Sequence, residues 1–333
     1  MTLLKATKVH KKGQGEFLLD NISFSQRKLE KVAVAGETGA GKSTLLKMVA
    51  GLIQPDGGEL LFEKKKIIGP DDQLVPGHPG IAYLSQHFEL QKSLRVEQVL
   101  AYANILSEGV AERLYKVCRI DHLLGRRTDQ LSGGEKQRVA ICRLLISSPR
   151  LLLLDEPFSH LDMAHKNMLK FVVRDIGEKL GITCMLVSHD PLDTLSWADK
   201  IMVMKDGKLI QKATPEIIYH QPVDEYTGGL FGKYNIIRPG SYKDFSVIKS
   251  FGKFVSQAGT RKSILIRPEQ FQLVKKSGQA VRAKVRKVSF LGSYREAEIE
   301  VGENIFTIKI WDQPVREGQT VYISILKDQW WRV

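Results

Sequence analysis

The sequence has few cysteines and no long apolar run, and both absences exclude classes of protein. Its cysteines are far apart in apolar surroundings, which indicates small buried residues rather than metal ligands or disulfides; they are Cys118, Cys142 and Cys184. No stretch approaches the roughly 20 apolar residues that span a bilayer. Residues 1–5 lack the apolar segment and the cleavage site of a signal peptide. We therefore expect the protein to stay in the cytosol.

Acidic residues are outnumbered by basic ones. The chain of 333 residues carries 50 lysines and arginines against 37 aspartates and glutamates, a formal net charge of +13. This surplus favours an anionic neighbour, either nucleic acid or the inner face of a membrane, and by itself it decides neither. The hydrophobic content of 43% argues against disorder, and the length predicts a larger domain followed by a smaller one.

The first part of the chain has the pattern of an α/β fold. Apolar runs at residues 31–35, 151–154 and 183–187 are typical of buried parallel strands. A helix with an apolar face is predicted from Lys42 onward, and it should end at Gly51. Strands that end in polar residues between helices place a site at the carboxyl edge of their sheet. We therefore expect the functional side chains at that edge.

Two other regions follow different patterns. Residues 88–148 contain periodic apolar positions, and we interpret them as an inserted helical subdomain. After about residue 235, apolar and polar residues alternate, as at residues 281–286, which predicts half-exposed strands separated by turns. We expect a larger domain at residues 1–235 and a small β-barrel domain at residues 236–333.

A glycine-rich segment follows the first buried strand and opens the first helix, which is the context of a phosphate-binding P-loop. The amides of such a loop converge on phosphate oxygens, and the helix N-terminus adds partial positive charge. Lys42 would hold the β- and γ-phosphates of ATP, and Ser43 would ligate Mg²⁺. The residues expected to contact the nucleotide are Gly36, Glu37, Thr38, Gly39, Ala40, Gly41, Lys42, Ser43 and Thr44.

Two acidic residues follow the apolar strand at residues 151–154. Asp155 can hold the Mg²⁺ shell, and Glu156 is positioned to orient or deprotonate the water that attacks the γ-phosphate. An apolar strand followed by two acids is common, so this pattern gains its weight from the P-loop. The two motifs together predict a nucleotide hydrolase of the P-loop (RecA-like) class.

The segment Leu-Ser-Gly-Gly-Glu-Lys-Gln-Arg at residues 131–138 resembles the signature of the ABC ATPase family. Ser132, Gly133 and Gly134 begin a helix and expose amides to an anion, which makes a second phosphate site. The resemblance implies that the signature of one subunit closes over ATP held by the P-loop of the other. It thus implies a homodimer that buries two ATP molecules at its interface.

Further positions match the same family. The resemblance implies that Gln86 touches the Mg²⁺ and attacking-water region and adjoins the surface that receives the permease. The resemblance also implies that residues 159–162, which end at Asp162, cross the dimer, and that His189 contacts the γ-phosphate.

The residue that stacks on adenine has two candidates. The family places an aromatic ring before the P-loop, where His10 aligns in this sequence. An imidazole ring can stack, although less extensively than tyrosine or tryptophan. Phe17 is the nearby alternative, and the sequence leaves both open.

The resemblance extends to importers that work with a binding protein, those for maltose-type sugars, polyamines, ferric iron, sulfate and molybdate. The matching segments are residues 198–201, 206–208, 214–219, 231–235 and 266–269. In this branch the last of them opens an OB-like domain that stabilises the dimer and can bind regulators or substrate. The resemblance implies transmembrane permease subunits as partners and, indirectly, an extracytoplasmic substrate-binding protein. It places the subunit at the cytoplasmic face of the inner membrane.

Two rival interpretations use the same ATPase motifs. An ABC ATPase that acts on nucleic acid would suit the basic charge, but such relatives usually carry two ATPase units or zinc-binding cysteine pairs, and this sequence has neither. An exporter ATPase is the closer rival. The C-terminal domain and the Arg-Pro-Glu segment at residues 267–269 favour import. We therefore expect no nucleic-acid partner.

Overall fold

The computed structural model describes residues 1–13, 17–87, 90–102, 104, 106–159, 161–247, 262–311, 313–326 and 331–333. These residues form two compact units, Met1–Pro215 and Glu216–Val333. The units divide before residue 235, and the domain boundary expected at that residue stays a prediction.

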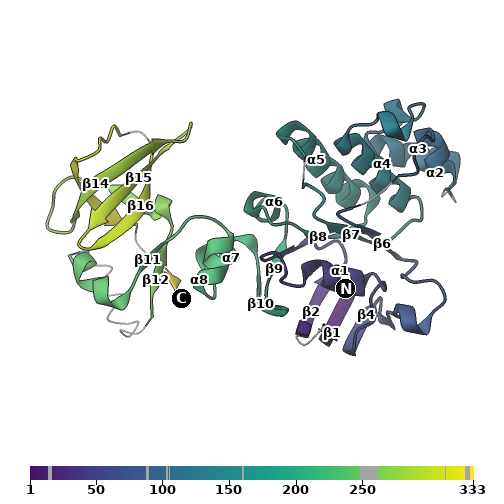
Figure 1. Ribbon diagram of the computed structural model, residues 1–333, viewed down its shortest axis with the longest axis horizontal. Coiled ribbons are helices and arrows are strands. Elements are labelled where there is room, and N and C mark those ends of the chain that lie inside the picture. The colour runs from purple at the N-terminus through teal and green to yellow at the C-terminus, as the bar shows by residue number, and fades with distance from the viewer. Residues whose placement is uncertain are drawn as a thin grey trace. The chain divides into compact units, whose positions relative to one another are not determined.

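The core of the first unit is a six-stranded sheet of order β10-β9-β3-β8-β7-β6 (Figure 1). Its strands are β3 (Val32–Ala35), β6 (Ile81–Leu84), β7 (Leu151–Asp155), β8 (Thr183–Val187), β9 (Lys200–Lys205) and β10 (Lys208–Ala213). All neighbours pair in parallel except β10, which pairs antiparallel with β9. Every residue of β3, β7 and β8 is buried, which confirms the buried parallel strands predicted from their apolar runs.

A second, antiparallel sheet lies on the other side of the first helix. Its order is β2-β1-β4-β5, with β1 (Thr2–Lys12), β2 (Phe17–Arg27), β4 (Gly57–Phe62) and β5 (Lys65–Lys66). Helix α1 (Lys42–Val49) shares one apolar cluster with both sheets, in which Leu46 and Val34 pack with Leu4. The α1 helix ends where expected, because Gly51 follows it with φ 77°, a backbone conformation that favours glycine.

Helices cover the remaining part of the first unit. Figure 1 shows α2 (Val96–Ala101), α3 (Glu108–Cys118) and α4 (Gly133–Leu145) gathered beside α5 (Met163–Leu180). Short 3-10 helices at Asp121–Leu123 and Thr128–Gln130 connect them, and another lies at Pro70–Asp72. Helices thus occupy this region, while the bounds of the helical subdomain at residues 88–148 stay a prediction; residues 88, 89, 103 and 105 lie outside the described residues. The short helix α6 (Pro191–Leu195) follows β8.

The second unit is rich in strands. A three-stranded sheet has the order β11-β12-β18, and a five-stranded antiparallel sheet has the order β13-β17-β14-β15-β16. The elements are α7 (Pro215–His220), α8 (Glu225–Leu230), β11 (Asn235–Ile237), a 3-10 helix (Pro239–Phe245), β12 (Ile264–Ile266), a 3-10 helix (Pro268–Gln270), β13 (Phe271–Leu273), β14 (Val281–Phe290), β15 (Arg295–Val301), β16 (Asn304–Ile310), β17 (Thr320–Ile325) and β18 (Trp331–Arg332).

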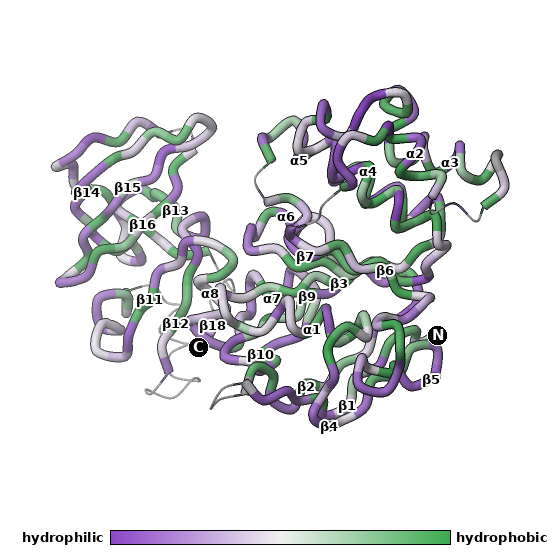
Figure 2. Tube along the Cα trace, turned by 45° about the vertical axis from the view of Figure 1, so that its right-hand side comes forward, coloured by the Kyte–Doolittle hydropathy of each residue, from purple (hydrophilic) through white to green (hydrophobic). Residues whose placement is uncertain are grey.

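The five-stranded sheet curls into a half-barrel. Hydrophobic and hydrophilic residues alternate along β14, β15 and β16 (Figure 2), and the inward side chains of β14 are Val281, Ala283 and Val285. The end strands β13 and β16 approach each other, which gives the sheet its curvature. The alternation predicted for this region is confirmed, and the domain is OB-like.

A buried arginine holds the start of the second unit together. Arg267 is 1% exposed, and its guanidinium donates hydrogen bonds of 2.9–3.3 Å to the carbonyl oxygens of Tyr219, Gly228, Gly232 and Lys233. The guanidinium carbon also lies 4.3 Å from the centroid of the Tyr219 ring. Burial lowers the pKa of Arg267, and its contacts attach the α7–α8 segment to the residues after β12.

Replacing Arg267 with Met should therefore destabilise the second unit. We expect the free energy of unfolding to fall by about 3 kcal/mol or more, because buried carbonyl oxygens lose their donor. Equilibrium urea unfolding of the full chain measures this change. Arg286→Met is the control, since this exposed arginine pairs with Glu300 on the sheet surface, and it should leave the transition in place. Equal stability of the two variants contradicts the prediction.

Candidate active site

The glycine-rich loop is compressed between neighbouring strands. It runs from the end of β3 to Gly41, the residue before α1, which has φ 91°. A Cβ at Gly41 would lie 2.6 Å from the carbonyl oxygen of Leu18, and one at Gly36 would lie 2.3 Å from that of Met204. Both positions therefore require glycine. The loop leads directly into the N-terminus of the two-turn helix α1. Backbone N–H groups at such a helix start favour binding of an anion.

Lys42 lies inside this loop. It is 7% exposed, and its ammonium donates hydrogen bonds of 2.8 Å to the carbonyl oxygens of Gly36 and Glu37. Burial lowers the pKa of Lys42, while the carboxylates of Glu156 and Asp155 act in the opposite direction. Of the other loop residues, Glu37, Thr38 and Gly39 are exposed, Ala40 is buried, and Ser43 and Thr44 are half-buried.

A hydroxyl and a carboxylate meet beside Lys42. The Ser43 Oγ donates to the Asp155 Oδ1 at 3.0 Å, and the Tyr83 hydroxyl donates to the Asp155 Oδ2 at 2.8 Å. Asp155 is 3% exposed at the end of β7. Burial, followed by the nearby Asp155 carboxylate, raises the pKa of Tyr83, so its phenol stays neutral and donates.

This oxygen pair fits Mg²⁺. That ion prefers hard oxygen ligands and usually takes one or two from the protein, completing its shell with water and substrate phosphates. Ser43 and Asp155 supply such a pair next to the phosphate loop. Among the described residues there is no group of three or more His, Cys, Asp or Glu side chains that could hold a metal. The residues present thus suit a nucleotide-bound Mg²⁺ rather than a protein-caged metal.

Glu156 and His189 form a pair at the same sheet edge. The Glu156 Oε2 lies 2.9 Å from the His189 Nδ1, and the Glu156 N–H donates to the Val187 carbonyl at 3.1 Å. Glu156 has φ 49°, which is uncommon for a residue with a side chain and which often marks functional sites. Because β7 and β8 are neighbouring parallel strands, Glu156 and His189 follow their carboxyl ends at the same edge of the sheet.

The three residues predicted to be catalytic line one polar cleft of about 260 Å³. These are Gln86, Glu156 and His189, and the cleft is completed by Phe158, Ser159, Lys166, Ser188, Asp190 and Asp193. The structure thus brings the predicted catalytic residues together. The loop residues and Asp155 adjoin them through the β3–β8–β7 register.

The signature segment begins α4. The Ser132 Oγ accepts a hydrogen bond from the Glu135 N–H at 3.3 Å, and the Ser132 N–H donates to the Glu135 Oε2 at 2.8 Å, which forms a capping box. Ser132 and Gly133 are exposed, whereas Gly134 is buried against His165.

Asp162 caps the N-terminus of α5. Its carboxylate accepts from the His165 N–H at 2.9 Å and contacts the His165 Nδ1 at 2.7 Å, and the backbone hydrogen bond lowers the pKa of Asp162. The Ser159 Oγ donates to the Glu156 carbonyl at 2.8 Å, so the segment that leads to Asp162 is tied to the catalytic turn.

The structure leaves the adenine contact open. His10 is half-exposed near the end of β1, and its imidazole lies over Gly57, where a Cβ would come within 2.3 Å of the His10 Cε1. Phe17 begins β2, but its side chain lies outside the described residues. His10 and Phe17 both stay alternatives for stacking on adenine.

Sequence reasoning missed three side chains of this region. The sequence patterns assign no role to Tyr83, although its hydroxyl donates a hydrogen bond to Asp155. Lys166 and Asp193 line the catalytic cleft from α5 and α6. No motif marks them, because their position depends on how two helices lie against the sheet.

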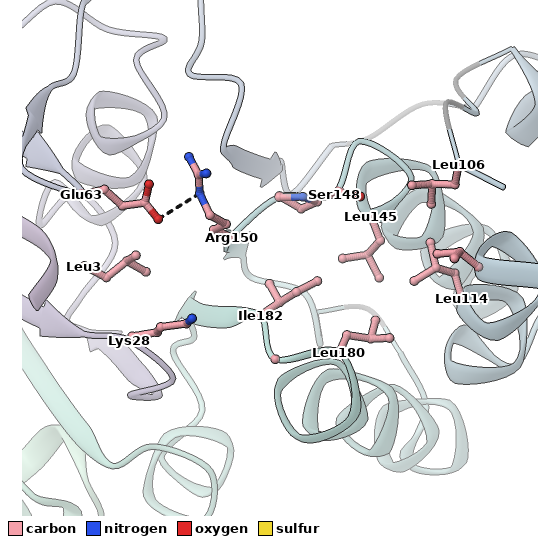
Figure 3. A pocket seen from close by; sticks show the side chains of 13 residues that line it. Leu3, Lys28, Glu63, Leu106, Leu114, Leu145, Ser148, Arg150, Leu180 and Ile182 are labelled. Carbon is pink, nitrogen blue, oxygen red and sulfur yellow. Dashed lines mark ion pairs between the residues drawn. The ribbon is translucent and has the colours of Figure 1, made fainter. Parts of the chain in front are cut away.

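A second cleft lies at the opposite edge of the sheet (Figure 3). Its lining is mainly aliphatic, with Leu114, Leu145 and Ile182 pointing into it, and Arg150 pairs with Glu63 at 3.0 Å on one side. Arg150 precedes β7 and Ile182 precedes β8, so this cleft adjoins the amino ends of the strands. It contains none of the predicted site residues and is not part of the nucleotide site.

Known proteins share this arrangement of loop, acidic strand and signature. A family model described as ABC transporter matches residues 19–159, and one described as TOBE domain matches residues 264–333. The glucose import ATP-binding protein GlcV of Saccharolobus solfataricus is 33% identical over 340 residues, which cover 97% of this chain and 96% of that protein. The chain belongs to the ABC transporter family.

Other relatives of this ABC transporter subunit are also import ATP-binding proteins. The spermidine/putrescine protein PotA of Clostridium acetobutylicum is 31% identical over 98% of this chain and 95% of that protein. The Fe(3+) ions import ATP-binding protein FbpC of Fusobacterium nucleatum is 29% identical over 98% of this chain and 92% of that protein. These matches confirm the importer branch with its C-terminal OB-like domain, and they confirm that the chain is an ATPase.

Solved structures confirm the ATPase fold. The cbiO1 structure from Clostridium perfringens, described as part of the ABC transporter complex cbiONQ, has a TM-score of 0.58 and 28% identity, and it covers 65% of this chain and 90% of that chain. The ATP-binding cassette MJ0796, in a dimeric post-hydrolysis state with ADP and Pi, has a TM-score of 0.55 and 25% identity. The match covers 64% of this chain and 99% of that chain. Nucleotide binding and dimerisation of cassettes are thus seen among structural neighbours of this ABC transporter subunit.

Replacing Tyr83 with Phe removes one hydrogen bond to Asp155 and keeps the ring. We expect the Mg²⁺ concentration at half-maximal ATPase activity to rise about tenfold, because partners that orient a metal ligand contribute on this scale to metal affinity. Steady-state hydrolysis over a Mg²⁺ series measures this shift. Tyr115→Phe on α3, away from Asp155, serves as the control and should match the unmodified chain. A Tyr83→Phe variant with unchanged Mg²⁺ dependence would show that Tyr83 does not support the ligand.

Proposed function

We propose that this chain works as a homodimer that binds two Mg²⁺-ATP and hydrolyses them to drive solute import through permease subunits. The observation that supports this proposal best is the Glu156–His189 pair of 2.9 Å, which shares a sheet edge with Lys42, Ser43 and Asp155. A base, a phosphate loop and a metal-ligand pair thus converge on one place.

ATP binding follows from the charges of the loop. The amides at residues 36–41 and the ammonium of Lys42 offer positive potential to the phosphates. Ser43 and Asp155 would hold Mg²⁺, which supplies neutralising charge for the β- and γ-phosphates when bound. The Tyr83 hydroxyl keeps the Asp155 carboxylate oriented.

Hydrolysis uses the paired carboxylate and imidazole. Glu156 accepts a proton from the attacking water or orients it, while the hydrogen bond from His189 fixes the position of the carboxylate. His189 is itself largely exposed, so its other ring nitrogen is available to the γ-phosphate. Gln86 lines the same cleft and completes the water site.

The dimer unites two half-sites. The start of α4 at Ser132 and Gly133 is exposed, so its backbone can approach an anion held by another subunit. In a head-to-tail pair, the γ-phosphate held by one loop would meet the signature helix of the partner. ATP then closes the pair, and its hydrolysis weakens the contact.

Replacing Glu156 with Gln should separate binding from turnover. We expect ATP hydrolysis to fall by about 100-fold or more, since a neutral amide cannot take the proton of the water. Gel filtration with Mg²⁺-ATP should show a stable dimer, because nucleotide binding is preserved. Phosphate release gives the rate, and Glu178→Gln, an exposed residue of α5, is the control that should keep it. Normal turnover of Glu156→Gln refutes the role of this base.

The same variant tests the composite site. Adding Ser132→Arg to Glu156→Gln should abolish the ATP-dependent dimer, because a bulky side chain blocks the helix start. Binding of a fluorescent ATP analogue to the monomer should remain. A dimer that persists in the double variant excludes the signature as the second half of the nucleotide site.

The import relatives carry names for glucose, spermidine/putrescine and ferric ions, and these span different chemical classes. We propose import of a small solute chosen by the permease and by an extracytoplasmic binding protein, with no nucleic-acid partner. The working position is the cytoplasmic face of the inner membrane. Among the described residues, no helix is long and apolar enough to cross a bilayer.

A groove in the first unit fits a permease segment. It has a volume of about 730 Å³ and a mainly apolar lining that includes Leu52, Val75, Ile81, Tyr83 and Leu144. Val75 is 78% exposed, which is unusual for an aliphatic residue unless a partner covers it. The groove thus offers an apolar docking surface beside the strand that leads to Gln86.

Replacing Val75 with Asp should release the subunit from the membrane. A charge in the apolar groove opposes burial by the permease, so we expect most of the tagged protein to move from the membrane fraction to the supernatant. ATPase activity of the purified chain should stay within about twofold, as surface substitutions have small effects. Val247→Asp, which adds the same charge elsewhere, is the control. Retention of Val75→Asp on membranes argues against this docking surface.

A further inference from the structure

The loop that carries His189 is held by two neighbouring carboxylates. The Asp190 N–H donates to the Ser188 Oγ at 3.1 Å, and the Ser188 Oγ donates to the Asp193 Oδ2 at 3.1 Å. The Ser188 N–H in turn donates to the carbonyl of Val34 in β3 at 3.4 Å. The position of His189 therefore depends on residues on both sides of it.

Two lysines of α5 bind these carboxylates. Lys166 pairs with the Asp190 Oδ2, and its Nζ lies 2.9 Å from the Asp193 Oδ1. Lys170, one turn further along α5, lies 2.8 Å from the same Asp193 oxygen. The Asp193 side chain is 2% exposed and that of Lys166 is 16% exposed. Ion pairs shielded to this degree hold geometry far better than exposed ones.

The same helix begins at the segment next to Glu156. The Lys166 N–H donates to the Asp162 carbonyl at 2.9 Å, so Lys166 lies in the first turn of α5. The chain before Asp162 is tied to Glu156 by the hydrogen bond of 2.8 Å from Ser159. The first turn of α5 thus connects the base with the loop of its histidine partner.

We propose that Lys166 is a positioning residue that holds His189 against Glu156 and transmits displacements of the first turn of α5 to it. The inference rests on the proposed ATPase mechanism. Lys166 acts through Asp190 and Asp193, which face it from the loop after β8 and from α6. Loss of its charge would free the His189 loop, and misplacement of a catalytic group by an ångström has large effects on rate.

A double-mutant cycle tests this role. ATP turnover is measured for Lys166→Met, His189→Ala and the combination of both. We expect Lys166→Met to lower kcat by about 10- to 100-fold, with KM for ATP changed less than about threefold, because positioning and not nucleotide binding is lost. In the His189→Ala background the lysine change should cost no more than about twofold, since residues that act through one another are not additive.

Two further variants distinguish a loss of His189 positioning from a general loss of structure. Lys166→Arg keeps a cation in reach of both carboxylates and should restore most of kcat. Lys179→Met removes the ion pair of 2.9 Å with Asp175 at the other end of α5, and it should leave kcat unchanged. Thermal unfolding shows whether Lys166→Met is folded. If it is not, Lys166→Met combined with Asp190→Asn takes its place, because that pair leaves no unpaired charge at residue 190.

The outcomes distinguish the inference from the function it rests on. Multiplying effects of Lys166→Met and His189→Ala, or an equal loss in Lys179→Met, would overturn the positioning role. So would a normal kcat in Lys166→Met while Glu156→Gln is inactive in the same assay. Normal turnover of Glu156→Gln would instead remove the proposed catalytic mechanism itself.

Discussion

The hydrogen-bond register of three buried parallel strands is the constraint on which the site depends. Val34 of β3 and Asp155 of β7 both pair with Val187 of β8, so the three strands end level with one another. The phosphate loop, the acidic pair and His189 begin where these strands end. A shift of register by one residue would move Glu156 and His189 apart by about 3.3 Å, the rise of a strand per residue, and would break the hydrogen bond between them.

The charges around Lys42 and at the start of α4 bear on the dimer that we propose. The carboxylates of Glu156 and Asp155 favour the charged form of Lys42, while burial lowers its pKa, so the ammonium lies in the loop among carbonyl oxygens of its own chain. At the start of α4, the Glu135 carboxylate accepts a hydrogen bond from the Ser132 N–H, and Ser132 and Gly133 are exposed. In the dimer that we propose, the negative charges of one nucleotide would meet the loop of one subunit and the start of α4 of the other.

Much of the fold and of the site could be predicted from the sequence. The apolar runs of β3, β7 and β8 and the alternation in β14 predicted their elements, because each pattern matches the period of its structure. Contacts between distant segments could not be read this way. The Tyr83 hydroxyl reaches Asp155 only through the register of β6 with β7, and Lys166 reaches Asp190 only through the packing of α5. Neither leaves a periodic or motif signal in the chain.

Tyr83 belongs to two surfaces at once. One side of the residue lines the apolar groove, and its hydroxyl is hydrogen-bonded to the carboxylate that completes the oxygen pair with Ser43. The groove and the Asp155 carboxylate are therefore connected through a single side chain. A rotation of that side chain would reshape the groove and withdraw the hydroxyl from Asp155 in the same movement.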